Sequence, residues 1–274
     1  RWECKRWADF KNNLTLVSQS NQFQQKHFTT LHSLNEWNCF EDFIRDCPFT
    51  EKQDLARDSE ELPPYGNNLT FTISEYKKFN QTSGTQGKPM AWLDTMEDWK
   101  WMLGNWDRVL EAAGVHPGAR CFFAFSFGPF LGFWTAYEAA TQRGCVCIPA
   151  GGQSTEQRLH GILNQKAEHL FCTPTYAMRL TSYAKEAGID LSGHKLKSII
   201  VAGETGGSLV EVRNRISAGW GNGVAVHDHY GMTEVGPVAY EMPGGQGGLR
   251  IILESYYPEV IDPKNLDPVK DGDR

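Results

Sequence analysis

The sequence lacks long apolar runs, blocks of like charge and an apolar N-terminal segment. No apolar stretch approaches the ~18 residues that can cross a bilayer, and the first residues do not form the apolar core of a signal peptide. The net charge of −6 is spread along the chain, so no basic surface is expected to attract nucleic acid or a charged membrane. We expect a cytoplasmic protein that acts neither on nucleic acid nor at a membrane.

Cysteines in the paired spacing of a metal site are also missing. The seven cysteines are an odd number, and their spacing is not typical of a metal site. They are interpreted as reduced thiols, and we expect buried packing roles for Cys121, Cys145, Cys147 and Cys172. With 274 residues, of which 40% are hydrophobic, the chain can bury a core as one large domain or two small ones.

One stretch, from Gln81 to Pro89, combines two glycines, three hydroxyl side chains and a lysine without any apolar residue. Glycines let backbone N–H groups turn inward, and lysine adds positive charge, so this composition favours a polyphosphate-binding loop over a plain polar turn. It is not a Walker loop, because Thr82 stands at the position of the first glycine and Pro89 follows Lys88.

After this stretch, short apolar runs alternate with longer amphipathic ones, a pattern typical of βαβ units. We predict strands at residues 121–125, 145–149, 169–172, 197–202 and 224–228. Helix caps are predicted at Thr95, at Ser154 with Gln157, and at Ser208 with Glu211. The predicted fold class is α/β with a parallel sheet: a helical part over residues 1–80, an α/β core over 81–235 and a β-rich part over 236–274.

Glycine-rich or polar residues follow four of the predicted strands. They are Ser126–Gly128, Gly151–Gln153, Gly203–Glu204 and His229–Glu234. Ligands of open parallel sheets bind outside the carboxyl ends of the strands, so we expect these four segments to meet in one crevice.

Several of these segments carry a family resemblance. T-S-G-T-Q-G-K-P at residues 82–89 resembles the phosphate loop of the adenylate-forming enzymes. Y-G-M-T-E (230–234), A-G-E (202–204), P-A-G-G-Q (149–153), T-P-T-Y-A (173–177) and P-E-V-I-D-P (258–263) are similar to motifs of the phenylacetate–CoA ligase family, in family order. The chain also ends before the family's hinge and small C-terminal domain, so it resembles a truncated N-terminal core.

The resemblance implies a reaction and its participants. A carboxylic acid attacks the α-phosphate of ATP with Mg²⁺, and coenzyme A or another thiol acceptor captures the acyl-adenylate. A homodimer is a possible assembly of the chain. By this resemblance the phosphate-binding residues are Thr82, Ser83, Gly84, Thr85, Gly87 and Lys88; the adenine-lining residues are Gly203, Glu204, Asp228, His229 and Tyr230; and the catalytic residues are Thr233, Glu234 as the Mg²⁺ ligand, and Lys88.

Aromatic residues beside a glycine pair suggest the acid site. Phe125, Phe127 and Phe130, with Gly151 and Gly152, form a candidate pocket for a flat aryl acid, although other acids fit as well. Phe133 and Trp134 are expected to pack the sheet against its helix. His227 and His229 are too few for a metal site without a third ligand.

Two other functions stay open. A noncatalytic nucleotide-binding module, or pseudoenzyme, is compatible with the missing C-terminal residues. An α/β-hydrolase is the second alternative, because Ser126, Asp190 and His227 follow the chain order of a catalytic triad, although Ala124 replaces a glycine of the nucleophile elbow. Thr205 also replaces the family's proline after Glu204, which we expect to be tolerated because backbone geometry makes that contact.

Overall fold

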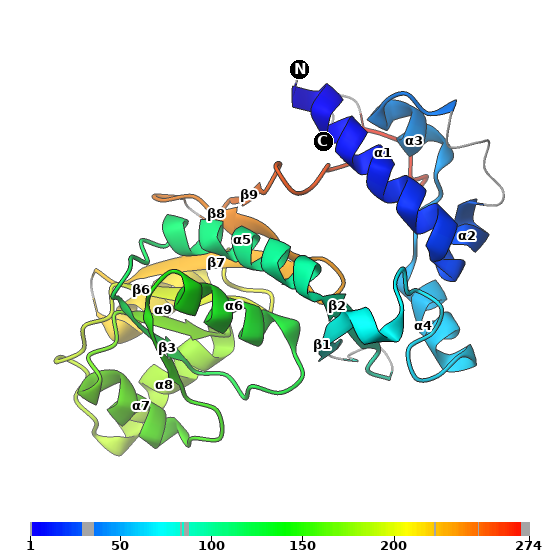
Figure 1. Cartoon of the computed structure of the whole chain (residues 1–274). Coiled ribbons are helices and arrows are strands. Elements are labelled where there is room, and N and C mark those ends of the chain that lie inside the picture. Colours follow the sequence, from blue (N-terminus) through cyan, green and yellow to red (C-terminus); the bar gives the residue numbers. More distant parts are fainter. Residues whose placement is uncertain are drawn as a thin grey trace. The chain divides into compact units, whose positions relative to one another are not determined.

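The protein forms two compact units, Arg1–Trp99 and Lys100–Arg274 (Figure 1). The computed structural model describes residues 2–28, 36–82, 84, 88–221, 223–245 and 247–269. No helix within these ranges is both long and apolar enough to span a bilayer.

Helices make up the first part of the N-terminal unit. They are α1 (Trp2–Ser20), α2 (Gln22–Phe28), α3 (Phe40–Asp46) and α4 (Lys52–Glu61). Aromatic rings pack α1 against α3, since the ring centroid of Phe40 lies 5.3 Å from the ring centroids of both Trp7 and Phe10. The helix α3 ends before Pro48, because the residue before a proline avoids helical backbone angles.

A β-hairpin completes this unit and carries the glycine-rich stretch as its loop. The strands β1 (Tyr76–Gln81) and β2 (Ala91–Thr95) pair antiparallel, with Gln81 opposite Ala91. The base of the loop is closed by two hydrogen bonds: the Thr82 amide donates to the Met90 carbonyl, and the Met90 amide donates to the Thr82 hydroxyl, both at 3.0 Å.

The second unit is built on a seven-stranded sheet of order β4-β3-β5-β6-β7-β8-β9. Its strands are β3 (Arg120–Phe123), β4 (Val146–Pro149), β5 (His169–Cys172), β6 (Ser198–Val201), β7 (Ala225–Met232), β8 (Gly236–Glu241) and β9 (Leu249–Ile251). The ladders from β4 to β7 are parallel, and those from β7 to β9 are antiparallel. The predicted α/β fold with a parallel sheet is confirmed.

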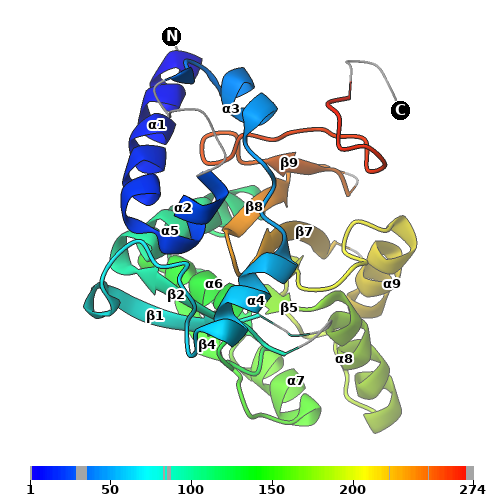
Figure 2. The ribbon, with the colours of Figure 1, turned by 90° about the vertical axis from the view of Figure 1, so that its right-hand side faces the viewer.

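Helices cover both faces of this sheet. They are α5 (Met96–Ala112), α6 (Leu131–Gln142), α7 (Thr155–Asn164), α8 (Pro174–Ala187) and α9 (Val210–Trp220). On one face, buried Leu170 and Ile199 share a core with Leu159, Leu180 and Ile216 from α7, α8 and α9, which follow one another along the sheet (Figure 2).

The opposite face packs against α5 and α6. The ring centroid of Tyr137 in α6 lies 5.2 Å from that of Phe123 in β3, and the ring centroid of Trp106 in α5 lies 4.3 Å from that of His229 in β7. The Trp106 indole also donates a hydrogen bond to Thr135 of α6 at 2.7 Å, which joins the two helices. The sheet is therefore buried between two helical layers.

Most predicted caps are confirmed. Thr95 and Asp98 exchange hydrogen bonds at the start of α5, and Ser154 with Gln157 forms a capping box at α7. The prediction for α9 is wrong, because its N-cap is Leu209 and carries no side-chain cap. The hydroxyl of Ser208 instead donates to the carboxylate of Asp228 at 2.5 Å, since a buried carboxylate requires a partner more than an exposed helix end does.

Two of the four cysteines expected to be buried are confirmed. Cys121 and Cys172 are fully buried in central strands. Cys145 and Cys147 are only partly buried, because β4 lies at the edge of the sheet. Free thiols are found at Cys39, Cys47, Cys121, Cys145, Cys147 and Cys172.

We predict that Asp94 makes the stability of the hairpin depend on pH. Asp94 is buried in β2 and accepts a hydrogen bond from Asn80 at 3.0 Å, and burial raises its pKa to about 7. Between pH ~4 and ~7 the folded chain therefore binds more protons than the unfolded chain, so the free energy of unfolding falls as pH rises through this window.

The substitution Asp94→Asn should flatten that profile. It keeps an acceptor for Asn80 but cannot ionise, so urea unfolding at pH 8 should give a free energy roughly 2–4 kcal/mol above the wild type, with little difference at pH 4. Glu61→Gln, at an exposed position of α4, is the control and should leave the profile unchanged. Parallel profiles for the wild type and Asp94→Asn would contradict the assignment.

Candidate functional site

The four segments predicted to converge do leave the same edge of the sheet. Ser126–Gly128 follows β3, Gly151–Gln153 follows β4, and Gly203–Glu204 follows β6. Because β3 to β7 run parallel, the carboxyl ends of these strands lie along one edge. The fourth segment, His229–Glu234, differs from the prediction, because β7 does not end at Asp228 but continues to Met232.

This extension of β7 exists because β8 turns back alongside it. Tyr230 pairs with Ala239, and Gly231 pairs with Pro237 after a register irregularity. A Cβ on Gly231 would lie 2.7 Å from the Gly236 carbonyl oxygen, so the close approach of the two strands requires glycine there. Tyr230 is 50% exposed, which leaves its ring face open to a ligand.

Asp228, two residues before Tyr230 on β7, carries a carboxylate that is held in a fixed position. Asp228 is 9% exposed, and the Ser208 hydroxyl donates to its Oδ2 atom at 2.5 Å. Burial raises the pKa of this carboxyl, and the Ser208 hydrogen bond opposes the rise. A Cβ on Gly207 would overlap the Asp228 carboxyl group, so this position also requires glycine. The turn after β6 and the strand β7 are thus fitted to each other at Asp228.

Two more residues of the predicted adenine site have identifiable partners. The Glu204 carboxylate accepts a hydrogen bond at 2.6 Å from the hydroxyl of Thr175, in the first turn of α8, where negative charge is favourable. Burial lowers the pKa of His229 to about 4, so its imidazole is neutral and packs on Trp106. A contact between His229 and a ligand at this edge would therefore use its backbone. Gly203 adopts φ +84°, which suits glycine.

The aromatic residues after β3 form one cluster. The ring of Phe125 stacks on Phe133 at 4.2 Å, and that of Phe130 lies 5.8 Å from Phe133. Phe127 adopts φ +53°, an uncommon backbone angle for a large residue, and a Cβ on Gly151 would lie 3.2 Å from its ring. The predicted acid-site residues after β3 and β4 are therefore in contact.

The expectation for Trp134 is wrong. This residue is 39% exposed and lies 5.2 Å from Phe127, and its indole donates to the Gly128 carbonyl at 3.0 Å. Its ring and its indole N–H thus contact the loop after β3 instead of packing the sheet against α6.

Sequence analysis missed Arg158, which organises the same region. From α7 its guanidinium donates to the carbonyls of Ala150 at 3.0 Å, Ala124 at 3.3 Å and Phe125 at 3.3 Å, and it lies over the Tyr176 ring at 5.0 Å. These contacts tie the ends of β3 and β4 together. In the sequence Arg158 looks like any helical arginine, and no local signal distinguishes it.

The glycine-rich stretch belongs to the other unit. Of its predicted phosphate-binding residues, Ser83, Thr85 and Gly87 lie outside the described residues. Thr82 is buried, with its hydroxyl bonded to the Met90 amide. The Lys88 ammonium lies 3.6 Å from the Glu60 carboxylate, and both side chains are largely exposed, so this ion pair is weak and is easily exchanged for another anion.

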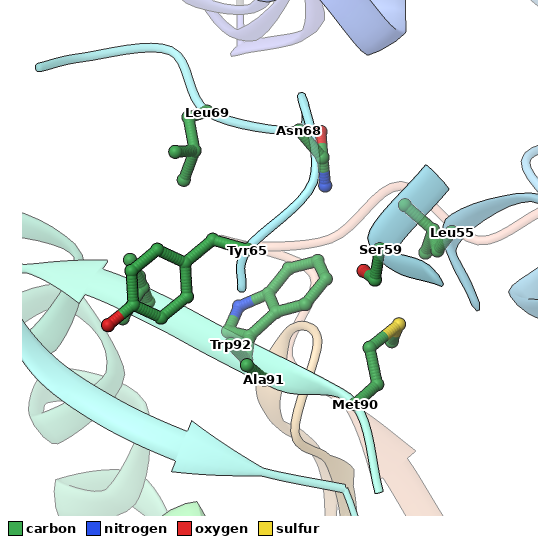
Figure 3. Close-up of a pocket in the computed structure, with 9 residues that line it drawn as sticks. Leu55, Ser59, Tyr65, Asn68, Leu69, Met90, Ala91 and Trp92 are labelled. Atoms are coloured by element: carbon green, nitrogen blue, oxygen red, sulfur yellow. The ribbon is translucent and has the colours of Figure 1, made fainter. Parts of the chain in front are cut away.

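A hollow lies beside this hairpin within the N-terminal unit (Figure 3). It is lined by Leu55, Ser59, Tyr65, Asn68, Leu69 and Met90–Leu93. The lining is mostly apolar and includes no charged side chain, so it offers no acid, base or phosphate-binding group.

The alternative hydrolase triad is wrong. Ser126 follows the carboxyl end of β3, whereas Asp190 precedes β6, at the opposite edge of the parallel sheet. The Asp190 carboxylate instead accepts hydrogen bonds from the amide and hydroxyl of Ser192, both at 2.8 Å.

Comparisons with known proteins agree with these features. A family model described as "AMP-binding enzyme" matches residues 79–274. Phenylacetate-coenzyme A ligase of Pseudomonas putida is 31% identical over 87% of the chain and 52% of its own length. The Escherichia coli (strain K12) enzyme of the same name is 29% identical over 84% of the chain and 51% of its own length. The chain therefore spans about half the length of these relatives.

Solved structures show the same fold. A 2-hydroxyisobutyryl-CoA ligase, crystallised with 2-HIB-AMP and CoA in the thioesterification state, superimposes with a TM-score of 0.88 at 24% identity. The match covers 96% of this chain and 56% of that structure. At this level of identity the match shows that the two chains share a fold.

We predict that Gly207→Ala destabilises the second unit. The new methyl group would overlap the Asp228 carboxylate, and overpacking of this kind costs about 1–3 kcal/mol, which lowers Tm by several degrees. Gly193→Ala is the matched control, because no atom would lie within 4 Å of the added methyl group and the backbone angle there is ordinary. Equal Tm values for the two variants in thermal unfolding would show that the turn and β7 are not fitted to each other as described.

Proposed function

Because the chain belongs to the family of AMP-binding enzymes, we propose that it is part of an acid–thiol ligase. In this proposal a carboxylate oxygen attacks the α-phosphorus of ATP, the bond to pyrophosphate breaks, and an acyl-adenylate forms. A thiolate then attacks the acyl carbon and AMP leaves. The observation that supports this most is that β7 carries, two residues apart at the carboxyl edge of the sheet, the carboxylate of Asp228 held by Ser208 and the half-exposed side chain of Tyr230.

Asp228 and Tyr230 suit an adenine base. Ser208 donates to the Oδ2 atom of Asp228, and because an ionised carboxylate can accept several hydrogen bonds, this side chain could also accept one from an exocyclic amino group. The exposed ring of Tyr230 offers a stacking face. Gly203, Glu204 and the backbone of His229 complete the proposed adenine site.

The proposed phosphate-binding residues come from the hairpin loop and from the turn between β7 and β8. Thr82, Ser83, Gly84, Thr85, Gly87 and Lys88 would bind the β- and γ-phosphates, and the weak Lys88–Glu60 pair would open to admit them. Thr233 would donate to the α-phosphate. These residue roles rest on their motifs and remain proposals.

Glu234 is the proposed magnesium ligand. The described residues contain no group of three or more His, Cys, Asp or Glu side chains suited to a metal. A single carboxylate fits Mg²⁺, which usually keeps several waters and takes its other ligands from substrate phosphates. When bound, the ion would neutralise negative charge on those phosphates.

The proposed substrate is an aryl acid, and the proposed acceptor is coenzyme A or another thiol. The sequence relatives are phenylacetate-coenzyme A ligases. Phe127 beside Gly151, together with Phe125 and Phe130 around Phe133, offers aromatic surface for a flat ring, and Gly152 completes the proposed acid site. A cytoplasmic site of action is part of the proposal and is supported by the free cysteines.

We predict that an aryl-sulfamoyl adenosine, which mimics the acyl-adenylate, binds the chain at least ~100-fold more tightly than ATP with Mg²⁺, because it occupies the acid and adenine sites together. Isothermal titration calorimetry measures both affinities. Tyr230→Ala should weaken the mimic about tenfold or more through loss of stacking. Val146→Ala, at an exposed position of the edge strand β4, is the control and should bind as the wild type does.

The outcomes separate the candidate functions. Binding of neither ligand by the folded chain would contradict the proposal. Tight binding would identify a noncatalytic nucleotide-binding module instead if a chain of the relatives' full length also formed no pyrophosphate from ATP and any aryl or alkyl acid.

We also predict that Gly151→Val discriminates between acid and nucleotide binding. The added side chain would press on the Phe127 ring, so the aryl mimic should lose about tenfold or more in affinity while AMP binds within about twofold of the wild type. Equal loss for AMP and the mimic would place Gly151 outside the acid site. An alkyl-sulfamoyl adenosine that binds the wild type as tightly as the aryl mimic would refute the preference for aryl acids.

A further inference from the structure

A buried ion pair lies behind the candidate adenine site. Arg213 of α9 and Glu241, the last residue of β8, form a two-point contact at 2.7 and 2.8 Å, with side chains only 16% and 2% exposed. Neither residue carries a motif, and the proposed reaction assigns neither of them a role.

The pair is bonded to the backbone of three separate segments. The Arg213 guanidinium also donates to the carbonyls of Gly207 at 2.9 Å and Val226 at 2.6 Å. The Glu241 carboxylate also accepts from the amides of Asp228 at 3.1 Å and Gly247 at 3.2 Å. These contacts join the turn after β6, the strand β7 and the loop after β8.

The contact with Asp228 occurs where β7 changes partners. The pairing of β7 with β8 begins at His229 opposite Tyr240. The amide of Asp228, one residue earlier, donates its hydrogen bond to the Glu241 carboxylate and not to a carbonyl of a neighbouring strand. Arg213 holds the carbonyl of Gly207, whose Cα lies against the Asp228 carboxyl group. The turn that carries Ser208 and the strand that carries Asp228 are therefore both hydrogen-bonded to this ion pair.

We propose that Arg213 and Glu241 are positioning residues that set the affinity for the adenine nucleotide by fixing Asp228 and the turn at 206–208. This inference rests on the proposed function. Neither residue touches the ligand. An arginine is needed because its planar fork bonds both carboxylate oxygens and two carbonyls at once, which the ammonium of a lysine cannot do.

A second ion pair in the same unit provides a matched control. At the opposite edge of the sheet, Arg120 donates to the Glu168 carboxylate at 2.6 Å and to the Lys166 carbonyl at 2.8 Å. Glu168 is buried, as Glu241 is, and its carboxylate also accepts from Lys197 at 3.3 Å, at the edge of the sheet away from Asp228. Loss of an arginine fork can therefore be compared at two places in one fold.

The test compares Arg213→Lys with Arg120→Lys. For each variant and the wild type, Tm is measured by thermal unfolding, and AMP affinity is measured by calorimetry at a temperature where all three are folded. Arg213→Lys should weaken AMP about tenfold, as expected for the loss of one or two charge-assisted hydrogen bonds that hold the site. Arg120→Lys should lower Tm but keep AMP affinity within about twofold.

A gentler variant covers the case in which Arg213→Lys does not fold. Glu241→Gln keeps the side-chain volume and one acceptor oxygen, and should weaken AMP by about fivefold. Hydrogen exchange gives a local readout, since the amides of Asp228 and Gly247 should exchange faster in Glu241→Gln while those of the central strand β5 stay protected.

Two results would overturn the inference: a folded Arg213→Lys or Glu241→Gln that binds AMP as the wild type does, or an equal loss of affinity in Arg120→Lys. If the wild type itself binds neither AMP nor the adenylate mimic, the proposed function fails, and the inference fails with it. Wild-type binding that is insensitive to both variants leaves the proposed function standing and removes only the positioning role.

Discussion

A sheet buried on both faces can offer chemistry only at the ends of its strands. Helices α7, α8 and α9 cover one face and α5 and α6 cover the other, so backbone and side chains within β3 to β7 serve packing. Parallel strands end together at one edge, and ligands of open parallel sheets bind to the segments that leave that edge. The candidate site is a consequence of this constraint, and its residues therefore come from four separate places in the sequence.

The candidate site is preorganised by contacts between protein groups, which exist before any ligand binds. Ser208 holds Asp228, Thr175 holds Glu204, and Arg158 joins the ends of two strands. Each of these partners comes from a helix or a helix terminus packed on the rigid sheet. Polar groups placed in this way need little reorganisation when a charged ligand arrives, which is the main source of electrostatic stabilisation in enzyme sites.

The sequence was informative where local chemistry decides the structure. The strand at residues 169–172 and the cap at Ser154 follow from apolar runs and hydrogen-bonding side chains, and both are confirmed. It was uninformative where a distant partner decides. The extension of β7 through Tyr230 depends on pairing with β8, Ser208 turns to Asp228 instead of capping its helix, and Arg158 is recognisable only from the three carbonyls around it. The hairpin β1–β2 also went unpredicted, because its pairing is set by the register across the glycine-rich loop.

The change of partner along β7 divides one strand into two mechanical parts. Up to Asp228 the strand is bonded to β6, and from His229 onward its pairing is with β8. The part up to Asp228 is held within the βαβ framework, whereas the part that carries Tyr230 belongs to the antiparallel segment that β7 forms with β8 and β9. The positions of the Asp228 carboxylate and of the Tyr230 ring therefore depend on two different sets of strand pairings, although only one residue separates them along the chain.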